Sequence, residues 1–510
     1  MSSRTRIVLY YPRQTTVGPP YATGPQDLPL PLLTIAAWPL ADGFEVVLID
    51  GARMRPEESE RRVLEACEGA LLFATTGILG PQIADAHACT QMVSAAFPEL
   101  PCFLGGWFAS VQPDIQLATG LYDAVAIGQG ELTFRELVQA VADDRSFEDV
   151  DGLAYLREGE VVRSNPRGVV GWDKLLDCPW ELLDFEDYRA PQLRRDVIPN
   201  GYPMGHIPRI EISYYSSFGC PIQCTFCCSP LVSDLRWKAM PASRMLDDLE
   251  LLQQRWGFDG VHFYDANFGV SEKRVRAFCV GLLERGIKIE WYAYLQAQSI
   301  VEYDATTLDL MRESGLYACV IGAEAGTDDM LAQIKKPTRG DDNIKAALEM
   351  TKRGVSPLMS YIIGYPEEDE ASMLATIEQA RRVALACPDA YVMVWPFHPL
   401  PGTEEFERAV AAGYEAPQTI EAWARAGENW IEEVWPGRIP AHVEEAREMY
   451  MHFAALAQGR VRKRQGFWER RARRRLERGD YAKGRLEARL FHLVNKLTPE
   501  RHARMSMPGS

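Results

Sequence analysis

Short apolar runs alternate with amphipathic stretches over the first 142 residues. The apolar runs, rich in β-branched and aromatic residues, lie at 7–11, 44–49, 70–74, 102–104 and 124–127. Helical periodicity separates them, at about 32–40, 56–67, 83–97, 115–118 and 132–141. Strands and helices that alternate at this spacing predict a doubly wound, Rossmann-like parallel sheet with helices on both faces.

A second series of the same kind runs from about 208 to 403. Its predicted strands are 210–215, 260–264, 288–295, 317–322, 356–363 and 391–395, again with helical patterns between them. Six such units are too few for a closed eight-fold barrel, so we expect a partial (β/α)6 barrel of the TIM type, with its site at the carboxyl ends of the strands. The chain is predicted to divide into a first domain (1–150), a linker region with a hairpin (151–206), a core domain (207–410) and a helical C-terminal region with a basic tail (411–510).

The loops after three strands of the first domain are rich in small residues. These loops contain Thr75, Thr76, Gly77, Gly105, Gly106, Gly128, Gly130 and Glu131. Ligands of parallel α/β sheets bind at this edge, and glycines let the backbone approach a large ligand closely. From spacing alone, tight turns without a ligand explain the glycines equally well.

Three cysteines lie on a loop at the end of the first strand of the second series. Cys220, Cys224 and Cys227 have the spacing C-x3-C-x2-C, and Gly219 and Pro221 bend the loop. Three thiolates can hold three irons of a 4Fe-4S cluster and leave the fourth iron open to a ligand outside the protein. The alternatives are a structural zinc site, which normally needs four protein ligands, and unligated buried cysteines. Cys228 is adjacent to Cys227, so it is a poor fourth zinc ligand.

The cysteine spacing, with the aromatic Phe226 before the last cysteine, resembles that of the radical S-adenosylmethionine (SAM) superfamily. In this family the open iron binds the amino and carboxylate groups of SAM. Three further stretches resemble SAM-contacting elements of the family: Glu324 in I-G-A-E-A-G-T, Gly364 in the turn G-Y-P, and Asp265 in F-Y-D-A-N-F. The resemblance implies that these residues and Phe226 contact SAM. Relatives often carry an arginine after the third strand, where this chain has L-Q-A-Q (295–298), so that contact is not carried over.

The first domain resembles the cobalamin-binding domain that precedes many radical SAM enzymes. The resemblance lies in P-L-P-L-L-T-I-A-A, G-F-E-V-V-L-I-D, L-G-G-W-F-A-S and I-G-Q-G-E-L-T-F. It implies that the three loops bind cobalamin. The motif D-x-H-x-x-G, whose histidine ligates cobalt in other cobalamin domains, is absent, and we expect His87 to be a surface residue. Residues 75–80 would then lie near the lower face of cobalt.

Together, the resemblances cover about residues 6–410 and imply a cobalamin-dependent radical SAM enzyme. The commonest outcome in this class is C-methylation of an unactivated carbon, which uses a 5′-deoxyadenosyl radical and methylcobalamin. Substrates would be secondary metabolites, lipids or cofactor precursors, free or carrier-bound, and flavodoxin or ferredoxin would supply electrons. The alternatives are an oxidative cyclase similar to the anaerobic magnesium-protoporphyrin cyclases, and a non-catalytic cobalamin or cluster sensor. The sequence does not identify the substrate.

Charge and composition bear on partners and compartment. The net charge is −16, but residues 459–505 carry 16 Lys and Arg against 5 Asp and Glu, which leaves −27 on the rest. An acidic body makes nucleic acid an unsuitable partner. The basic tail, with interleaved aromatic residues, fits an anionic membrane surface, an acidic carrier or packing on the acidic body. With 11 cysteines in no regular pattern, no long apolar span and no signal-peptide region, we expect a cytoplasmic protein, with peripheral contact with the membrane as an open alternative.

Overall fold

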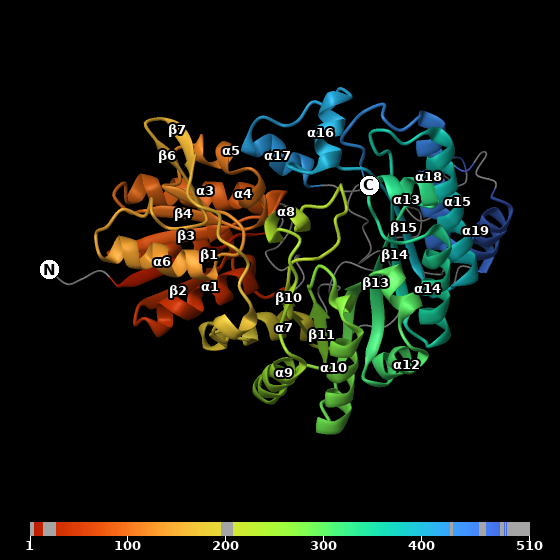
Figure 1. The fold of residues 1–510 in the computed structure, drawn as a ribbon, viewed down its shortest axis with the longest axis horizontal. Coiled ribbons are helices and arrows are strands. Elements are labelled where there is room, and N and C mark those ends of the chain that lie inside the picture. The colour runs from red at the N-terminus through yellow and green to blue at the C-terminus, as the bar shows by residue number, and fades with distance from the viewer. Residues whose placement is uncertain are drawn as a thin grey trace.

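The computed structural model describes residues 5–13, 27–194, 208–428, 432–457 and 466–479, together with 484 and 486. It consists of two sheets that lie side by side, each covered by helices (Figure 1). Most of the basic tail lies outside the described residues, as does His206.

The first sheet has the order β2-β1-β3-β4-β5-β6-β7. Its parallel strands are β1 (Arg6–Tyr11), β2 (Glu45–Asp50), β3 (Leu72–Thr76), β4 (Cys102–Gly105) and β5 (Ala124–Ala126). The hairpin of β6 (Leu153–Arg157) and β7 (Glu160–Arg163) adds to β5 in antiparallel orientation. This hairpin, which the sequence analysis assigned to the linker region, therefore extends the first sheet, because β5 would otherwise leave an unpaired edge.

Helices cover both faces of this sheet, as the alternating pattern predicted. On one face α1 (Leu30–Ala41) packs beside α6 (Glu131–Ala142). On the other lie α2 (Pro56–Cys67), α3 (Pro81–Ala96), α4 (Trp107–Val111) and α5 (Pro113–Leu117). The connection to the second sheet contains 3-10 turns at Trp172–Lys174 and Trp180–Leu182, and α7 (Glu186–Arg194).

The second sheet is parallel throughout, with the order β15-β14-β13-β12-β11-β8. Its strands are β8 (Glu211–Tyr214), β11 (Gly260–Phe263), β12 (Glu290–Leu295), β13 (Leu316–Glu324), β14 (Ser356–Ile363) and β15 (Tyr391–Pro396). The helices between them are α9 (Ala242–Trp256), α10 (Glu272–Arg285), α11 (Ala297–Glu302), α12 (Ala305–Glu313), α13 (Asp328–Gln333), α14 (Gly340–Lys352) and α15 (Glu370–Ala386). The predicted partial (β/α)6 barrel is confirmed. A small ribbon of β9 (Ser217–Phe218) and β10 (Lys238–Ala239), which the sequence analysis did not predict, brackets the cysteine loop and α8 (Ser229–Ser233).

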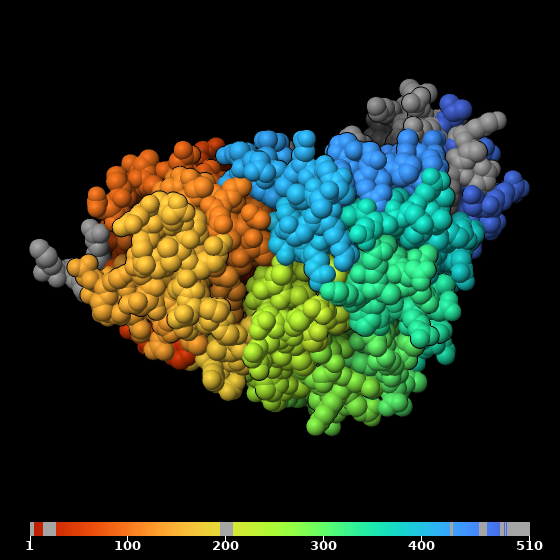
Figure 2. Space-filling model, turned by 45° about the horizontal axis from the view of Figure 1, so that its top comes forward, coloured from red at the N-terminus to blue at the C-terminus, as the bar shows by residue number. Residues whose placement is uncertain are grey.

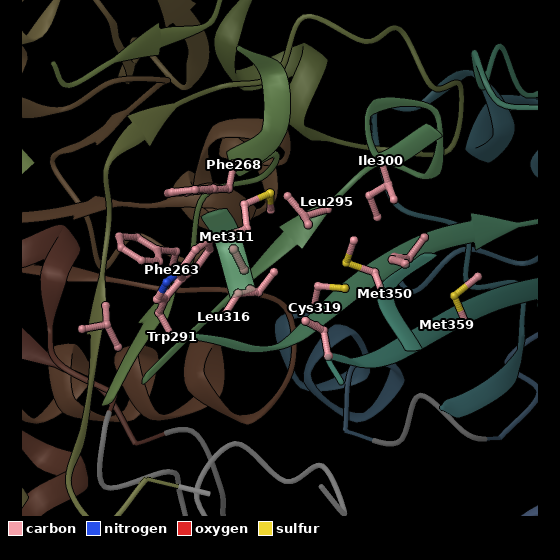
Figure 3. Packing of buried hydrophobic residues seen from close by; sticks show 14 of the residues in the cluster. Phe263, Phe268, Trp291, Leu295, Ile300, Met311, Leu316, Cys319, Met350 and Met359 are labelled. Atoms are coloured by element: carbon pink, nitrogen blue, oxygen red, sulfur yellow. The ribbon is translucent and has the colours of Figure 1, made fainter. Parts of the chain in front are cut away.

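Alternate residues of the barrel strands form the hydrophobic core between the sheet and its helices. Figure 3 shows Phe263, Trp291, Leu295 and Cys319 from successive strands packed with Met311 and Met350 from the surrounding helices. Because successive residues of a strand point to opposite faces, the residues between these face the concave side of the sheet. The concave side carries a smaller cluster that mixes tyrosines with aliphatic residues, including Tyr292, Val320 and Leu358.

The C-terminal region joins the two halves. Helix α17 (Ile420–Ala426) packs on α3 of the first domain, and α16 (Glu404–Ala411) precedes it (Figures 1 and 2). Helix α18 (Ala441–Ala457) covers β15, where Arg447 Nη1 donates to the Val394 carbonyl at 3.0 Å. The region thus covers the β15 edge of the open barrel. Helix α19 (Gly466–Arg478), the described part of the basic tail, packs on α18 through the buried Ala472 and Leu476. None of the helices described here is long and apolar enough to cross a membrane.

Candidate functional site

The loop that carries the three cysteines is anchored on two sides. Before it, the buried Asp265 accepts hydrogen bonds from the Ser216 amide at 3.0 Å and from the Ser216 hydroxyl at 2.7 Å. Within it, the Thr225 amide donates to the Ile334 carbonyl at 3.1 Å, and the Thr225 hydroxyl donates to Glu405 Oε1 at 2.8 Å. The segment from 220 to 228 is therefore held by β11, by the end of α13 and by α16. Both carboxylate oxygens of Asp265 accept these hydrogen bonds. Its expected contact with SAM therefore stays a prediction.

The three thiols lie close enough to influence one another electrostatically. Burial, together with the smaller effect of neighbouring thiols of the loop, raises the pKa of Cys224 to about 12 and that of Cys227 to about 11. The Ser229 amide approaches Cys227 Sγ at 3.4 Å. The Cys228 thiol instead faces the Pro401 carbonyl at 3.9 Å. Three thiols on one anchored loop fit a 4Fe-4S cluster with an open iron, and Cys228 is turned to a different neighbour.

A single-metal site finds no support in the described part of the chain. No group of three His, Cys, Asp or Glu side chains there is arranged to hold one metal ion.

Glu324 ends β13 beside the cysteine loop, and its carboxylate pairs with a residue that the sequence analysis missed. Lys336 Nζ lies 3.0 Å from Glu324 Oε1, with both side chains buried. Burial alone would lower the pKa of Lys336, but the charges of Glu324 and Cys224 offset it, and the pKa lies above its ordinary value. Glu324 has φ +60°, a left-handed conformation that costs a non-glycine residue about 1 kcal/mol or more. The sequence analysis did not identify Lys336, because a single lysine twelve residues after Glu324 belongs to no recognisable motif.

Phe226 and the G-Y-P turn meet in one aromatic group. The Phe226 ring lies 5.8 Å from the Tyr365 ring, which lies 5.0 Å from Phe397. Tyr365 is fully buried, and its hydroxyl has no hydrogen-bond partner among the described residues. The Gly364 amide donates to Glu368 Oε2 at 2.7 Å. The structure therefore brings Phe226 and the G-Y-P turn together beside the cysteine loop, and the SAM contacts of Phe226 and Gly364 stay predictions.

In the first domain, the predicted loops lie at the carboxyl edge of the sheet, and several of their groups bond to one another. The Thr75 hydroxyl donates to the Tyr10 carbonyl at 2.9 Å, and the Gly77 amide donates to the Gly105 carbonyl at 3.2 Å. Gly106 has φ +98°, and a Cβ there would lie 2.5 Å from Thr76 Oγ1. Gly106 is thus explained by loop packing, and its cobalamin contact stays a prediction.

Two buried polar atoms beside the loop after β5 have no hydrogen-bond partner in the described chain. The Gly128 amide donates to Ser110 Oγ at 3.0 Å, and Gly130 precedes α6. Glu131 Oε2 is buried without a hydrogen-bond partner in the described chain, and burial raises the pKa of this carboxyl. Glu131 borders a small cavity, with Trp38, whose indole N–H is also unpaired, on the opposite helix. One carboxylate oxygen of Glu131 and the Trp38 N–H thus lack a partner in the described chain, and the contact of Glu131 with cobalamin stays a prediction.

The two predicted cofactor loops are neighbours across the domain boundary. Helix α8, which begins two residues after Cys227, contacts α4 at the end of β4. A Cβ on Gly128 would lie 3.5 Å from the Val232 carbonyl of α8. The cysteine loop and the glycine-rich edge of the first sheet therefore face the same interdomain region, which neither sequence pattern alone specified.

The expectation for His87 was wrong. His87 is only 9% exposed, and its Nδ1 lies 3.0 Å from the Tyr122 hydroxyl. Burial lowers the pKa of His87 to about 4. Helix α17 covers this part of α3, so a position that helical periodicity placed on the surface is enclosed by a segment more than 300 residues away.

Comparison with known proteins agrees with this geometry. The model of the Radical SAM superfamily matches residues 214–380. An uncharacterized methyltransferase of Pyrococcus horikoshii is 28% identical over 329 residues, which are 64% of this chain and 67% of that protein. The anaerobic magnesium-protoporphyrin IX monomethyl ester cyclase of Synechocystis sp. is 23% identical over 356 residues, 69% of this chain and 67% of that protein. The matched region thus spans about two thirds of each relative.

A solved structure extends the likeness over both sheets. The radical SAM methyltransferase TsrM from Kitasatospora setae, with cobalamin and a 4Fe-4S cluster bound, superposes with a TM-score of 0.65 at 15% identity. The match covers 94% of this chain and 100% of that one. Residues 214–380 therefore form a radical SAM domain, and the chain as a whole has the fold of cobalamin-binding radical SAM enzymes.

Proposed function

We propose that the protein is a cobalamin-dependent radical SAM C-methyltransferase that acts on an unactivated carbon of a small or carrier-bound substrate. The observation that carries this proposal is the position of the cysteine loop against the glycine-rich edge of the first sheet, through α8 and α4. A cofactor on each side of this boundary would face a substrate between them. The methyltransferase from Pyrococcus horikoshii supports the reaction type, and TsrM supports the arrangement of domains.

Each group of residues has one part in this proposal. Cys220, Cys224 and Cys227 would hold the cluster. Glu324 and Lys336 would face the amino-acid end of SAM, since a carboxylate and an ammonium complement its two charges. With its cofactors bound, the enzyme would generate a carbon radical on the substrate and transfer a methyl group to it. The protein's own contribution is to orient the three ligands and to exclude water and oxygen from the interdomain region.

The first experiment is anaerobic purification with reconstituted cluster and cobalamin, followed by reduction in the presence of SAM. A methyltransferase of this class should form both 5′-deoxyadenosine and S-adenosylhomocysteine, and should transfer label from methyl-labelled SAM to an extracted metabolite fraction. No SAM cleavage by cluster-loaded protein would reject the enzyme assignment and favour a sensor.

An oxidative cyclase is the second candidate, because the relative from Synechocystis sp. carries that name. A cyclase would form 5′-deoxyadenosine without S-adenosylhomocysteine and without consuming methylcobalamin. The ratio of the two SAM products therefore separates the candidates before the substrate is known.

We infer that the partners are a small-molecule substrate and a reductant such as flavodoxin or ferredoxin, in the cytoplasm. The role of the basic tail as a contact for an anionic membrane or an acidic carrier rests on residues mostly outside the described chain. In α19, the exposed arginines Arg470, Arg471 and Arg474 lie opposite the packed Ala472 and Leu476. Truncation after Gln458 separates a partner-binding tail from a tail that only packs on the protein. If the tail binds an anionic partner, the truncated protein should still cleave SAM but should bind anionic vesicles less tightly. If the truncated protein does not fold, the role of the tail is structural.

A further inference from the structure

Aromatic side chains gather on the concave face of the barrel sheet, next to the first domain. The outward residues of β8, β11 and β12, such as Tyr214 and Phe263, belong to the core in Figure 3 or pack beside it. Their neighbours Tyr215, Tyr264 and Tyr294 therefore face the concave side. All three are only partly buried. The Tyr215 and Tyr264 rings lie 6.1 Å apart. We call these three residues the interdomain tyrosines.

A carboxylate of the first domain reaches this group. The Tyr264 hydroxyl donates to Asp27 Oδ1 at 2.5 Å, and the next residue, Leu28, donates its amide to Ser213 Oγ at 2.9 Å. Asp27 is partly exposed, and Arg53, whose charge also acts on Asp27, pairs with Asp50. The nearby Asp50, in contrast, has Arg53 Nε at 3.8 Å and the Tyr188 hydroxyl at 2.7 Å. Asp27 is thus a carboxylate whose hydrogen-bond partner is neutral.

A second observation points to a ligand in the same place. The His262 ring lies 3.9 Å from the Tyr264 ring and 5.7 Å from the Tyr294 ring. His262 is 1% exposed, its Nδ1 is 2.7 Å from the Tyr292 hydroxyl, and its Nε2 has no partner among the described residues. A buried polar nitrogen without a partner is rare unless water or a ligand supplies one. The concave face beneath the interdomain tyrosines therefore has an open hydrogen-bonding position.

We propose that Asp27 and the interdomain tyrosines bind a protonated amine of the substrate, between the two domains. This inference rests on the proposed function, since it assumes that the substrate occupies the boundary between the two cofactor-binding edges. An ammonium can pair with the Asp27 carboxylate while its N–H and CH₂ groups contact the tyrosine faces, and aromatic rings attract cations in this way. The cation would also add a charged partner to the half-buried Asp27 carboxylate, to which the Tyr264 hydroxyl donates a hydrogen bond. Burial raises the pKa of Asp27 to about 6, although the hydrogen bond from Tyr264 and the charge of Arg53 act in the opposite direction.

Two small probes of equal shape test the charge preference without knowledge of the substrate. Tyramine carries an ammonium where 4-propylphenol carries a methyl group. Their dissociation constants are measured by calorimetry on the full chain loaded with cluster and cobalamin, in the wild type, in Asp27→Asn and in the control Asp149→Asn, an exposed carboxylate. SAM cleavage is measured on the same preparations.

The expected result is that Asp27→Asn reduces the preference for tyramine over 4-propylphenol by about tenfold, while Asp149→Asn leaves it unchanged. An unchanged preference in folded Asp27→Asn would overturn the inference. If Asp27→Asn fails to fold, Tyr294→Leu replaces it, and an unchanged preference in that variant overturns the inference equally. Retained SAM cleavage with no amine preference would reject this site alone, whereas loss of cleavage in the wild type would reject the proposed function itself.

Discussion

Lys336 Nζ lies 3.0 Å from Glu324 Oε1, with 2% of the lysine side chain and 10% of the glutamate side chain exposed. The pair is attached to the cysteine loop, because the Thr225 amide binds the Ile334 carbonyl two residues before Lys336. The charge of Lys336 acts on all three thiols of the loop. It lowers the pKa of Cys220, Cys224 and Cys227, although burial raises each of them by more. A positive charge beside thiolates that must bind iron is a direct electrostatic advantage.

We expect Lys336→Met to destabilise the protein by about 3 kcal/mol, because Glu324 would keep a buried charge without its partner. The same variant should weaken SAM binding, measured by calorimetry on cluster-loaded protein. The matched control is Lys335→Met, whose exposed pair with Glu404 should contribute less than about 1 kcal/mol. Equal effects of the two substitutions on SAM affinity would argue against a role for Lys336.

Replacement of Cys220, Cys224 and Cys227 together by alanine should remove cluster iron and SAM cleavage. Cys228→Ala should retain iron near the wild-type level, because that thiol faces the Pro401 carbonyl. Iron content and the cluster EPR signal of the reduced protein measure both. Full iron content and full SAM cleavage in the triple variant would show that these three cysteines do not bind the cluster.

Cobalamin bound to the protein should show no nitrogen ligand on the lower face of cobalt. His87 is the one histidine in residues 1–150, and on α3 it is buried against Tyr122 and beneath α17. The cobalt(II) EPR spectrum should therefore lack nitrogen splitting from the protein, in the wild type and in His87→Gln alike. Nitrogen splitting that disappears in the variant would contradict this expectation.

Acid should weaken the fold through His87. Its pKa is about 4 in the folded protein and about 6.5 when unfolded, so the unfolded chain binds the proton more tightly between these values. The stability that His87 contributes is present above pH 6.5 and is lost as the pH falls toward 4. His87→Gln should reduce the loss of unfolding free energy over this window by about 1–3 kcal/mol, measured by urea titration at several pH values. An unfolding free energy that falls with acid as steeply in His87→Gln as in the wild type would contradict this expectation.

The contact between α17 and the first domain depends on two glycines. A Cβ on Gly427 would lie 2.6 Å from the Gly80 amide nitrogen, which is backbone and cannot move aside cheaply. Gly427→Ala should therefore cost about 1–3 kcal/mol and should increase protease cleavage near 427. Gly168→Ala, where a Cβ meets nothing within 4 Å, should be neutral. Identical melting temperatures for the two variants would show that the contact is not needed for docking.

The sequence by itself determined the local elements and the chemistry of the cysteine loop. Both parallel sheets follow from apolar runs separated by helical periodicity, since strands buried on both faces leave that pattern. The spacing of Cys220, Cys224 and Cys227 predicts a cluster-binding loop, because thiolates on one short loop can reach one cluster.

Only the tertiary structure decided which distant residues meet. Lys336 joins Glu324, Asp27 joins Tyr264, and α17 encloses His87 through contacts between segments far apart in the chain. Such contacts leave no periodicity in the sequence, because they depend on how two sheets and a C-terminal segment pack. The hairpin of β6 and β7 joined the first sheet for the same reason: its pairing with β5 is a property of the sheet edge and not of the hairpin itself.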